Sequence, residues 1–183
     1  MIKAVGLDVE VPAEAEIIDA KGMWVGPGFV DVHLHGDGIS SRWEYDPVTV
    51  AAYHLRHGST TTVPYLPYSL PKEKLLDATK MVQQKIDEGK MPNVWAIGFE
   101  GPFINPEQGA NSRSAVRPGT DPEEYIPLYE ACHGRIAQWM YAPEMDPTGQ
   151  FGDFLQEKGV TAAIGHTKAS PAQIRAAVDR GAT

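Results

Sequence analysis

The sequence has little cysteine, little positive charge and no long apolar run. Cys132 is the only cysteine among 183 residues, so no intramolecular disulfide can form and a reducing compartment fits best. Lys and Arg number 16 against 24 Asp and Glu, and this net charge of -8 argues against a nucleic-acid partner, because phosphate contacts need a basic face. No apolar stretch approaches the roughly 18 residues of a membrane span. The N-terminus also lacks the basic and apolar regions of a secretory signal, so we expect a cytoplasmic protein with no membrane partner.

From Pro27 onward, short apolar runs alternate with segments of helical pattern. We expect strands at residues 28–35, 59–66, 93–100, 135–142 and 159–166, and helices at residues 47–57, 71–88, 121–132, 148–158 and 171–180. Five strand–helix units predict a parallel sheet with crossover helices. A doubly wound open sheet is the alternative, but no Gly-rich phosphate loop follows the first strand. The pattern therefore favours an α/β fold with a partial (β/α)8 TIM-type barrel of about five units, since a complete barrel takes eight.

The first 26 residues follow a different pattern. "IKAVGLDVEV" and "EIIDA" are typical of short strands, joined by "PAEAE". We therefore expect residues 1–26 to be a fragment of a small β-sandwich module and residues 27–183 to be the N-terminal part of the barrel. Five of eight barrel strands would leave two open edges, which predicts self-association as a homo-oligomer.

Three of the expected strands end in residues that bind metals. His33 and His35 lie two apart on the first strand, so their side chains point to the same face. Glu100 ends the third strand and His166 the fifth, and in a barrel these strand ends share the rim that carries active sites. Each residue alone is more often packing or surface, but their coincidence at strand ends favours a metal site. Imidazole nitrogen with carboxylate oxygen suits Zn²⁺, Fe²⁺, Mn²⁺ or Ni²⁺ rather than Ca²⁺.

A long loop, "GFEGPFINPEQGANSRSAVRPG" at residues 98–119, follows the third strand. Loops of this length inside a domain tend to be functional or disordered, so a substrate-binding lid and a mobile surface insertion are both open. Arg113 and Arg117 in this loop could meet an anionic group or remain solvated.

Several motifs in this order resemble the amidohydrolase superfamily and, within it, N-acetylglucosamine-6-phosphate deacetylases. The resemblance covers essentially the whole chain. The matching text is "VGPGFVDVHLHG" at residues 25–36, "HGSTTTVPYL" at 57–66, "GFEGPFINPEQGAN" at 98–111, "YAPEMD" at 141–146 and "AIGHTKASPAQIRAAVDRGAT" at 163–183.

The resemblance implies a set of site residues. Glu100 and His166 would be metal ligands, and the pair of His33 and His35 would complete the site or hold a second ion, with Zn²⁺ as the first choice of metal. Substrate contacts would come from Gly109, Ala110 and Asn111, where Asn111 replaces the histidine usual in the family. The family's catalytic Asp, a further metal-binding His and a phosphate-contacting Arg would lie beyond Thr183. We therefore expect no catalytic Asp within the chain, and little or no activity from the chain alone.

The function implied is removal of the acetyl group from N-acetylglucosamine 6-phosphate, a small amino-sugar phosphate of carbohydrate metabolism, by a metal-dependent hydrolase. Asn111 keeps open another amidohydrolase that acts on a different N-acyl or cyclic amide substrate. A third alternative is a non-catalytic fragment that binds metal or sugar and assembles with another chain.

Overall fold

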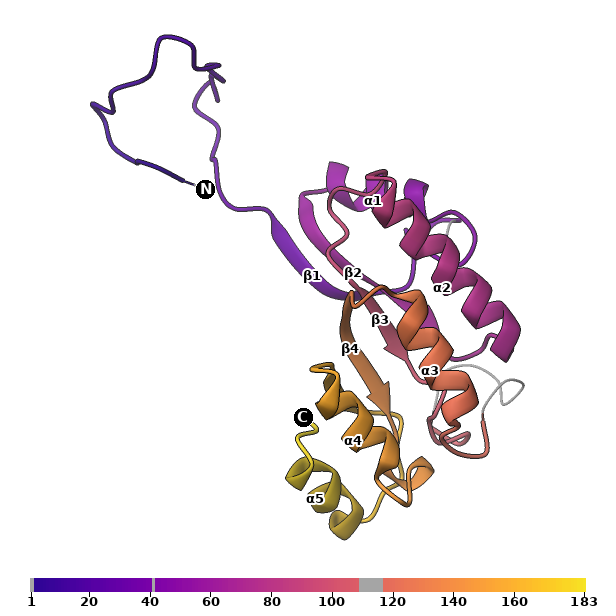
Figure 1. Ribbon diagram of the computed structural model, residues 1–183. Helices are drawn as coiled ribbons and strands as arrows, with labels where there is room; N and C mark the ends of the chain where they lie inside the picture. The colour runs from indigo at the N-terminus through magenta and orange to yellow at the C-terminus, as the bar shows by residue number, and fades with distance from the viewer. Residues whose placement is uncertain (1, 41, 109–116) are drawn as a thin grey trace.

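The computed structural model describes residues 2–40, 42–108 and 117–183, and its centre is a curled parallel sheet with helices packed along one face (Figure 1). The five strands pair in chain order. They are β1 (Phe29–Leu34), β2 (Ser59–Pro67), β3 (Ile97–Glu100), β4 (Ile136–Tyr141) and β5 (Thr161–Ile164). The helices are α1 (Pro47–Arg56), α2 (Lys72–Asp87), α3 (Pro122–Ala131), α4 (Gln150–Glu157) and α5 (Pro171–Asp179), with a 3-10 turn, η2 (Pro143–Met145), after β4. This half-barrel confirms the expected fold class.

Local signals explain why the helices begin where they do. α1 starts after Asp46, whose side chain accepts a hydrogen bond from the Thr49 amide, and α5 starts with a capping box between Ser170 and Gln173. Proline occupies an early position in both helices, where a missing N–H costs nothing. Because these signals depend on residues close in sequence, the expected helix bounds agree with the observed ones to within two residues.

The largest difference from the expected strands is at the start of β3. β3 begins at Ile97 rather than at residue 93, because Asn93 and Trp95 exchange backbone hydrogen bonds with Thr62 alone.

Beyond α5, the Thr183 amide donates to the Ala162 carbonyl oxygen at 2.8 Å, and the Ile164 amide donates to the Thr183 carbonyl oxygen at 2.9 Å. The backbone at Thr183 therefore extends the sheet beyond β5, as a further strand would.

The core between the sheet and the helices is rich in aromatic rings. Phe99 of β3 stacks on Trp139 of β4 with ring centroids 4.3 Å apart, and the Trp139 indole N–H donates to the Gly101 carbonyl oxygen. Phe151 of α4 packs edge-to-face on Trp139 at 5.3 Å. All three rings are fully buried. Buried aromatic rings of this kind dominate the packing energy of a core.

The other face of the sheet is the inside of the half-barrel, and it is shaped by Tyr65 of β2. Tyr65 pairs with Gly98 of β3, and a Cβ added to Gly98 would lie 2.2 Å from the Tyr65 ring. Glycine at this position therefore makes room for the Tyr65 ring. The Tyr65 hydroxyl donates to the Gln138 side chain of β4, so the ring spans three neighbouring strands.

The expected short strands in the N-terminal segment are absent. Residues 2–28 contain no strand and extend away from the sheet (Figure 1). Leu7 and Trp24 in this segment are fully exposed. A strand needs a neighbour to accept its backbone hydrogen bonds, and an isolated pair is marginal in water. Assignment of this segment to a β-sandwich module stays a prediction.

No helix among the described residues is long and apolar enough to cross a membrane.

Candidate metal centre

The carboxyl ends of β1 and β3 bring together two histidines and a glutamate. His33 lies in β1, His35 follows its last residue, and Glu100 ends β3. One ligand atom from each lies within 4.8 Å of the other two. His33 Nε2 is 3.2 Å from His35 Nε2, which is 3.1 Å from Glu100 Oε2. Ligand atoms of a tetrahedral zinc site lie about 3.4 Å apart when the bonds are near 2.1 Å. The three side chains therefore fit a single divalent ion.

His166 reaches the same carboxylate from the other side. It lies two residues beyond β5, and its Nε2 is 2.5 Å from Glu100 Oε1. Glu100 thus directs one oxygen toward His35 and the other toward His166. The structure brings all four expected residues together at one end of the sheet, and that they bind a metal stays a prediction.

Backbone carbonyl groups orient two of the imidazole rings. His35 Nδ1 is 3.2 Å from the Tyr65 carbonyl oxygen, and His166 Nδ1 is 2.5 Å from the Gln108 carbonyl oxygen. A carbonyl oxygen can only accept, so each Nδ1 carries a proton and each Nε2 faces Glu100. Metal-binding histidines in proteins commonly have this arrangement, because it fixes both the tautomer and the ring.

Tyr65 supports the third imidazole. The His33 ring stacks on the Tyr65 ring with centroids 3.7 Å apart and planes 16° apart. Burial raises the pKa of Tyr65 to about 12, so the hydroxyl stays protonated and continues to donate to Gln138. Sequence reasoning missed Tyr65 as a site residue, because residues 62–66 of β2 are all buried and no alternation marks its inward position.

The electrostatics of the cluster favour a cation. Burial disfavours the charged form of Glu100, but hydrogen bonds with His35 and His166 outweigh it and lower the pKa to about 2. The hydrogen bond to Glu100 raises the pKa of His35, whereas burial and the neighbouring His35 lower the pKa of His33. Glu100 is therefore an anion at any ordinary pH, and His33 is biased toward the neutral form that a metal needs.

His166 has a strained backbone. Its φ angle is +48°, in the left-handed region that residues other than glycine rarely adopt. Such a conformation costs on the order of 1–3 kcal/mol and persists only where the surroundings hold it.

Affinity for a divalent ion should fall as the pH falls from about 8 to about 6, because imidazole must lose its proton to bind a metal. The pKa of His35 is raised, so protons compete at His35 at a higher pH than at an ordinary histidine. For each histidine from which the metal must displace a proton, the apparent metal affinity falls about tenfold per pH unit below the pKa of that histidine. Competition titrations with Zn²⁺ and a chromophoric chelator measure this, and an affinity that does not change with pH would remove the histidines from the site.

The loop after β3 is described only in part. Gly109, Ala110 and Asn111, the expected substrate-binding residues, lie outside the described residues, as does Arg113. Arg117 is described, and its guanidinium donates to the Glu124 carboxylate at 2.6 to 3.0 Å. Both side chains are largely buried. Arg117 is therefore largely removed from solvent and paired with a carboxylate of the chain itself.

A polar pocket adjoins the cluster. It has a volume of about 430 Å³ and is lined by His35, Asp37, Ser40 and Arg42, among other residues of the loop after β1.

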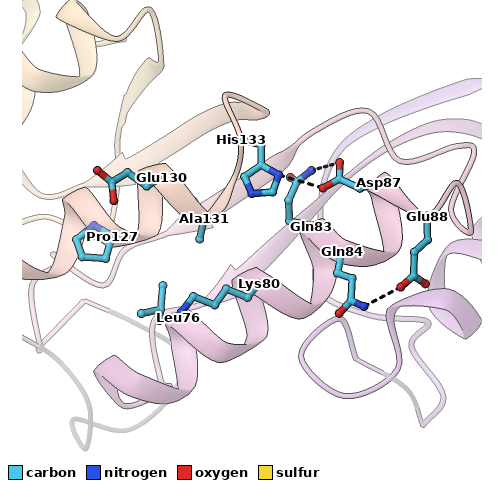
Figure 2. Close-up of a pocket in the computed structure, with 10 residues that line it drawn as sticks. All are labelled: Leu76, Lys80, Gln83, Gln84, Asp87, Glu88, Pro127, Glu130, Ala131 and His133. Carbon is cyan, nitrogen blue, oxygen red and sulfur yellow. Dashed lines mark hydrogen bonds and ion pairs between the residues drawn. The ribbon is translucent and has the colours of Figure 1, made fainter.

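A larger groove of about 640 Å³ lies elsewhere, between α2 and α3 (Figure 2). Gln83 and His133 both bond to the Asp87 carboxylate there, at 2.8 and 3.0 Å. Asp87 ends α2 and His133 precedes β4, so the groove lies at the opposite end of the strands from Glu100. It is not part of the candidate metal centre.

Known proteins resemble the chain over most of its length. The chain is 29% identical to N-acetylglucosamine-6-phosphate deacetylase from Danio rerio over 185 residues, which cover 91% of this chain and 43% of that protein. A solved structure from Mycobacterium smegmatis is 35% identical with a TM-score of 0.76 and covers 86% of this chain and 41% of that one. That structure is a variant N-acetyl-D-glucosamine-6-phosphate deacetylase in complex with N-acetyl-D-glucosamine-6-phosphate.

A second class of enzyme matches over a shorter region. Dihydroorotase from Lactobacillus gasseri is 34% identical over 106 residues, which cover 58% of this chain and 23% of that protein. No family model matches the chain. The chain spans less than half the length of the deacetylases that it matches, and in sequence and fold it fits their N-terminal portion.

Proposed function

We propose that the chain is part of a metal-dependent hydrolase that removes the acetyl group from N-acetylglucosamine 6-phosphate in amino-sugar catabolism. The observation that carries the proposal is the cluster of His33, His35, Glu100 and His166, within a chain that resembles deacetylases along most of its length. Similarity to dihydroorotase covers little more than half of the chain, which favours the linear acetamide over a cyclic amide as substrate.

The residues fit a divalent ion, for which we propose Zn²⁺ because the donors combine imidazole nitrogen with carboxylate oxygen. Such an ion, when bound, supplies Lewis acidity toward the acetamide carbonyl and lowers the pKa of water. Glu100 supplies the negative charge that holds the ion, and the two carbonyl contacts keep the Nε2 atoms of His35 and His166 directed at it.

The four candidate ligands are poorly suited to move protons. The Nδ1 protons of His35 and His166 are held by backbone carbonyls, and a Glu100 pKa of about 2 makes this carboxylate a weak base. Asp37 is also engaged, since its Oδ1 accepts the amides of Ile39 and Ser40. Efficient general bases have a pKa near the working pH. Proton transfer therefore needs a further group, and the family resemblance assigns that role to an Asp that is not in this chain.

Substrate contacts remain a proposal for Gly109, Ala110 and Asn111. An amide at residue 111 both donates and accepts, so it can bond a sugar hydroxyl or the acetamide.

Self-association remains a proposal as well. Val30 and Val32 on the edge strand β1 are 65% and 62% exposed, and a second copy would cover this apolar edge. We keep the cytoplasm as the proposed location.

Acetate release tests the proposed function. The chain alone and the chain joined to the C-terminal portion of a deacetylase are assayed with Zn²⁺ and N-acetylglucosamine 6-phosphate, alongside unphosphorylated N-acetylglucosamine. Dihydroorotate is assayed separately by its ring opening, because its hydrolysis releases no acetate. We expect the joined protein to prefer the phosphorylated sugar, and the chain alone to be slower by at least about 100-fold, the usual cost of losing a general acid or base.

A Glu100→Ala version of the joined protein is the control and should lose the activity. Faster turnover of dihydroorotate, or acetate release that does not depend on Glu100, would contradict the proposal.

A further inference from the structure

A glutamate outside the metal cluster holds the segment that carries His166. Glu144 lies in η2, just after β4, and is partly buried. Its Oε1 accepts the Lys168 amide at 2.7 Å, and its Oε2 accepts the Thr167 hydroxyl. Burial disfavours the charged form of Glu144, but hydrogen bonds led by that of Thr167 outweigh it and lower the pKa. An ionised carboxylate thus holds the two residues that directly follow His166.

The same carboxylate reaches His166 from a second direction. Asn105 donates its side-chain amide to Glu144 Oε1 at 2.9 Å, and its backbone amide donates to the His166 carbonyl oxygen at 2.9 Å. The Gln108 amide donates to the Asn105 carbonyl oxygen at 3.0 Å, and the Gln108 carbonyl oxygen is the group that receives the His166 Nδ1 proton. Glu144 therefore connects to the imidazole through the loop after β3 as well as through the backbone after β5.

These contacts surround a residue that would not adopt its conformation unaided. His166 has a φ angle of +48°, and its Nε2 must point at Glu100 to be useful. Strained backbone persists where neighbouring contacts over-determine it. Residues on both sides of His166 are fixed, since the Gly165 amide donates to the Tyr141 carbonyl oxygen at 3.1 Å and Thr167 and Lys168 bond to Glu144.

We propose that Glu144 is a positioning residue for His166, which fixes both the backbone and the Nδ1 contact of this imidazole so that Nε2 faces Glu100. The proposal rests on the proposed function only in so far as it takes His166 as a metal ligand. Glu144 touches neither Glu100 nor the histidine ring, so it acts through Thr167, Lys168, Asn105 and Gln108.

Three variants separate positioning from general stability. Glu144→Ala removes both acceptor oxygens, whereas Glu144→Gln keeps the shape and can still pair with the amide and hydroxyl partners. Glu124→Gln is the matched control, because Glu124 is also a carboxylate removed from solvent that holds the loop after β3, through Arg117. Its bonds to Arg117 do not involve residues 166–168. Circular dichroism and thermal unfolding first establish that each variant is folded.

The first readout needs no metal. In the metal-free chain at about pH 8, where an ordinary imidazole is neutral, the His166 Nδ1 proton is followed by ¹H–¹⁵N NMR of the ring. We expect a slowly exchanging proton in the parent chain and in Glu124→Gln, a faster one in Glu144→Ala, and restoration in Glu144→Gln. An unchanged proton in Glu144→Ala would overturn the proposal.

The second readout is Zn²⁺ affinity. Loss of an outer residue that orients a ligand typically weakens metal binding by about 10- to 100-fold, which we expect for Glu144→Ala, with a smaller loss for Glu144→Gln and no loss for Glu124→Gln. An affinity in Glu144→Ala equal to that of the parent chain would overturn the role in metal binding. A parent chain that binds no Zn²⁺ while the NMR result holds would count against the proposed function and leave Glu144 as the residue that positions His166.

Discussion

Replacing Glu100 by alanine should lower the Zn²⁺ affinity of the chain by more than about 100-fold, beyond the range seen when only an outer orienting residue is lost. Glu100 is the one anion among the four candidate ligands, and its two oxygens contact His35 at 3.1 Å and His166 at 2.5 Å. Its loss would leave His35 and His166 without their shared partner. A competition titration with a chromophoric chelator gives the affinity.

Glu88→Ala is the matched control for this measurement. The pKa of Glu88 is also lowered to about 2, but by hydrogen bonds from Lys90, Lys85 and Gln84 at the end of α2. Its removal should leave the affinity unchanged. Equal losses in the two variants would show that bulk negative charge, rather than the geometry at the strand ends, attracts the metal.

Glu124→Ala should lower the free energy of unfolding by about 3–5 kcal/mol, the usual cost of leaving one member of a buried ion pair without its partner. The side chains of Arg117 and Glu124 are 11% and 3% exposed, so removal of the carboxylate would leave the buried guanidinium without its anionic partner. Urea unfolding measures the change.

Two controls test the physical reason. Lys72→Ala breaks the exposed pair between Lys72 and Asp121 and should cost about 0–1 kcal/mol. Replacing Arg117 and Glu124 together by apolar residues should recover much of the stability, because no buried charge is then left alone. A Glu124→Ala variant as stable as Lys72→Ala would mean that the buried pair is absent in solution.

The sequence was sufficient to predict the parallel sheet, the helices and the convergence of His33, His35, Glu100 and His166. Proline and capping residues mark the helices locally, and parallel strands place their carboxyl ends at one rim, so residues far apart in sequence could be placed together without a structure.

The contacts that orient the site were not predictable in this way. The bond from His166 Nδ1 to Gln108, the stacking of His33 on Tyr65 and the bonds of Glu144 all depend on where loops and inward side chains lie in space. The burial of Arg117 against Glu124 was missed for the same reason. The short strands expected in the N-terminal segment are absent from residues 2–26. This strand-like sequence has no neighbouring strand to pair with among the described residues.

Anomalous diffraction from crystals of the Zn²⁺-loaded chain tests the metal centre most directly. We expect a zinc peak at the carboxyl end of the sheet, with bonds of about 2.0–2.2 Å to His33, His35 and Glu100. His166 Nε2 should be a further ligand, of this ion or of a second ion on the other oxygen of the same carboxylate, with its Nδ1 on the Gln108 carbonyl oxygen. Zinc bound elsewhere, for example at His133 and Asp87 in the groove between α2 and α3, with the strand-end histidines free of metal, would contradict the account.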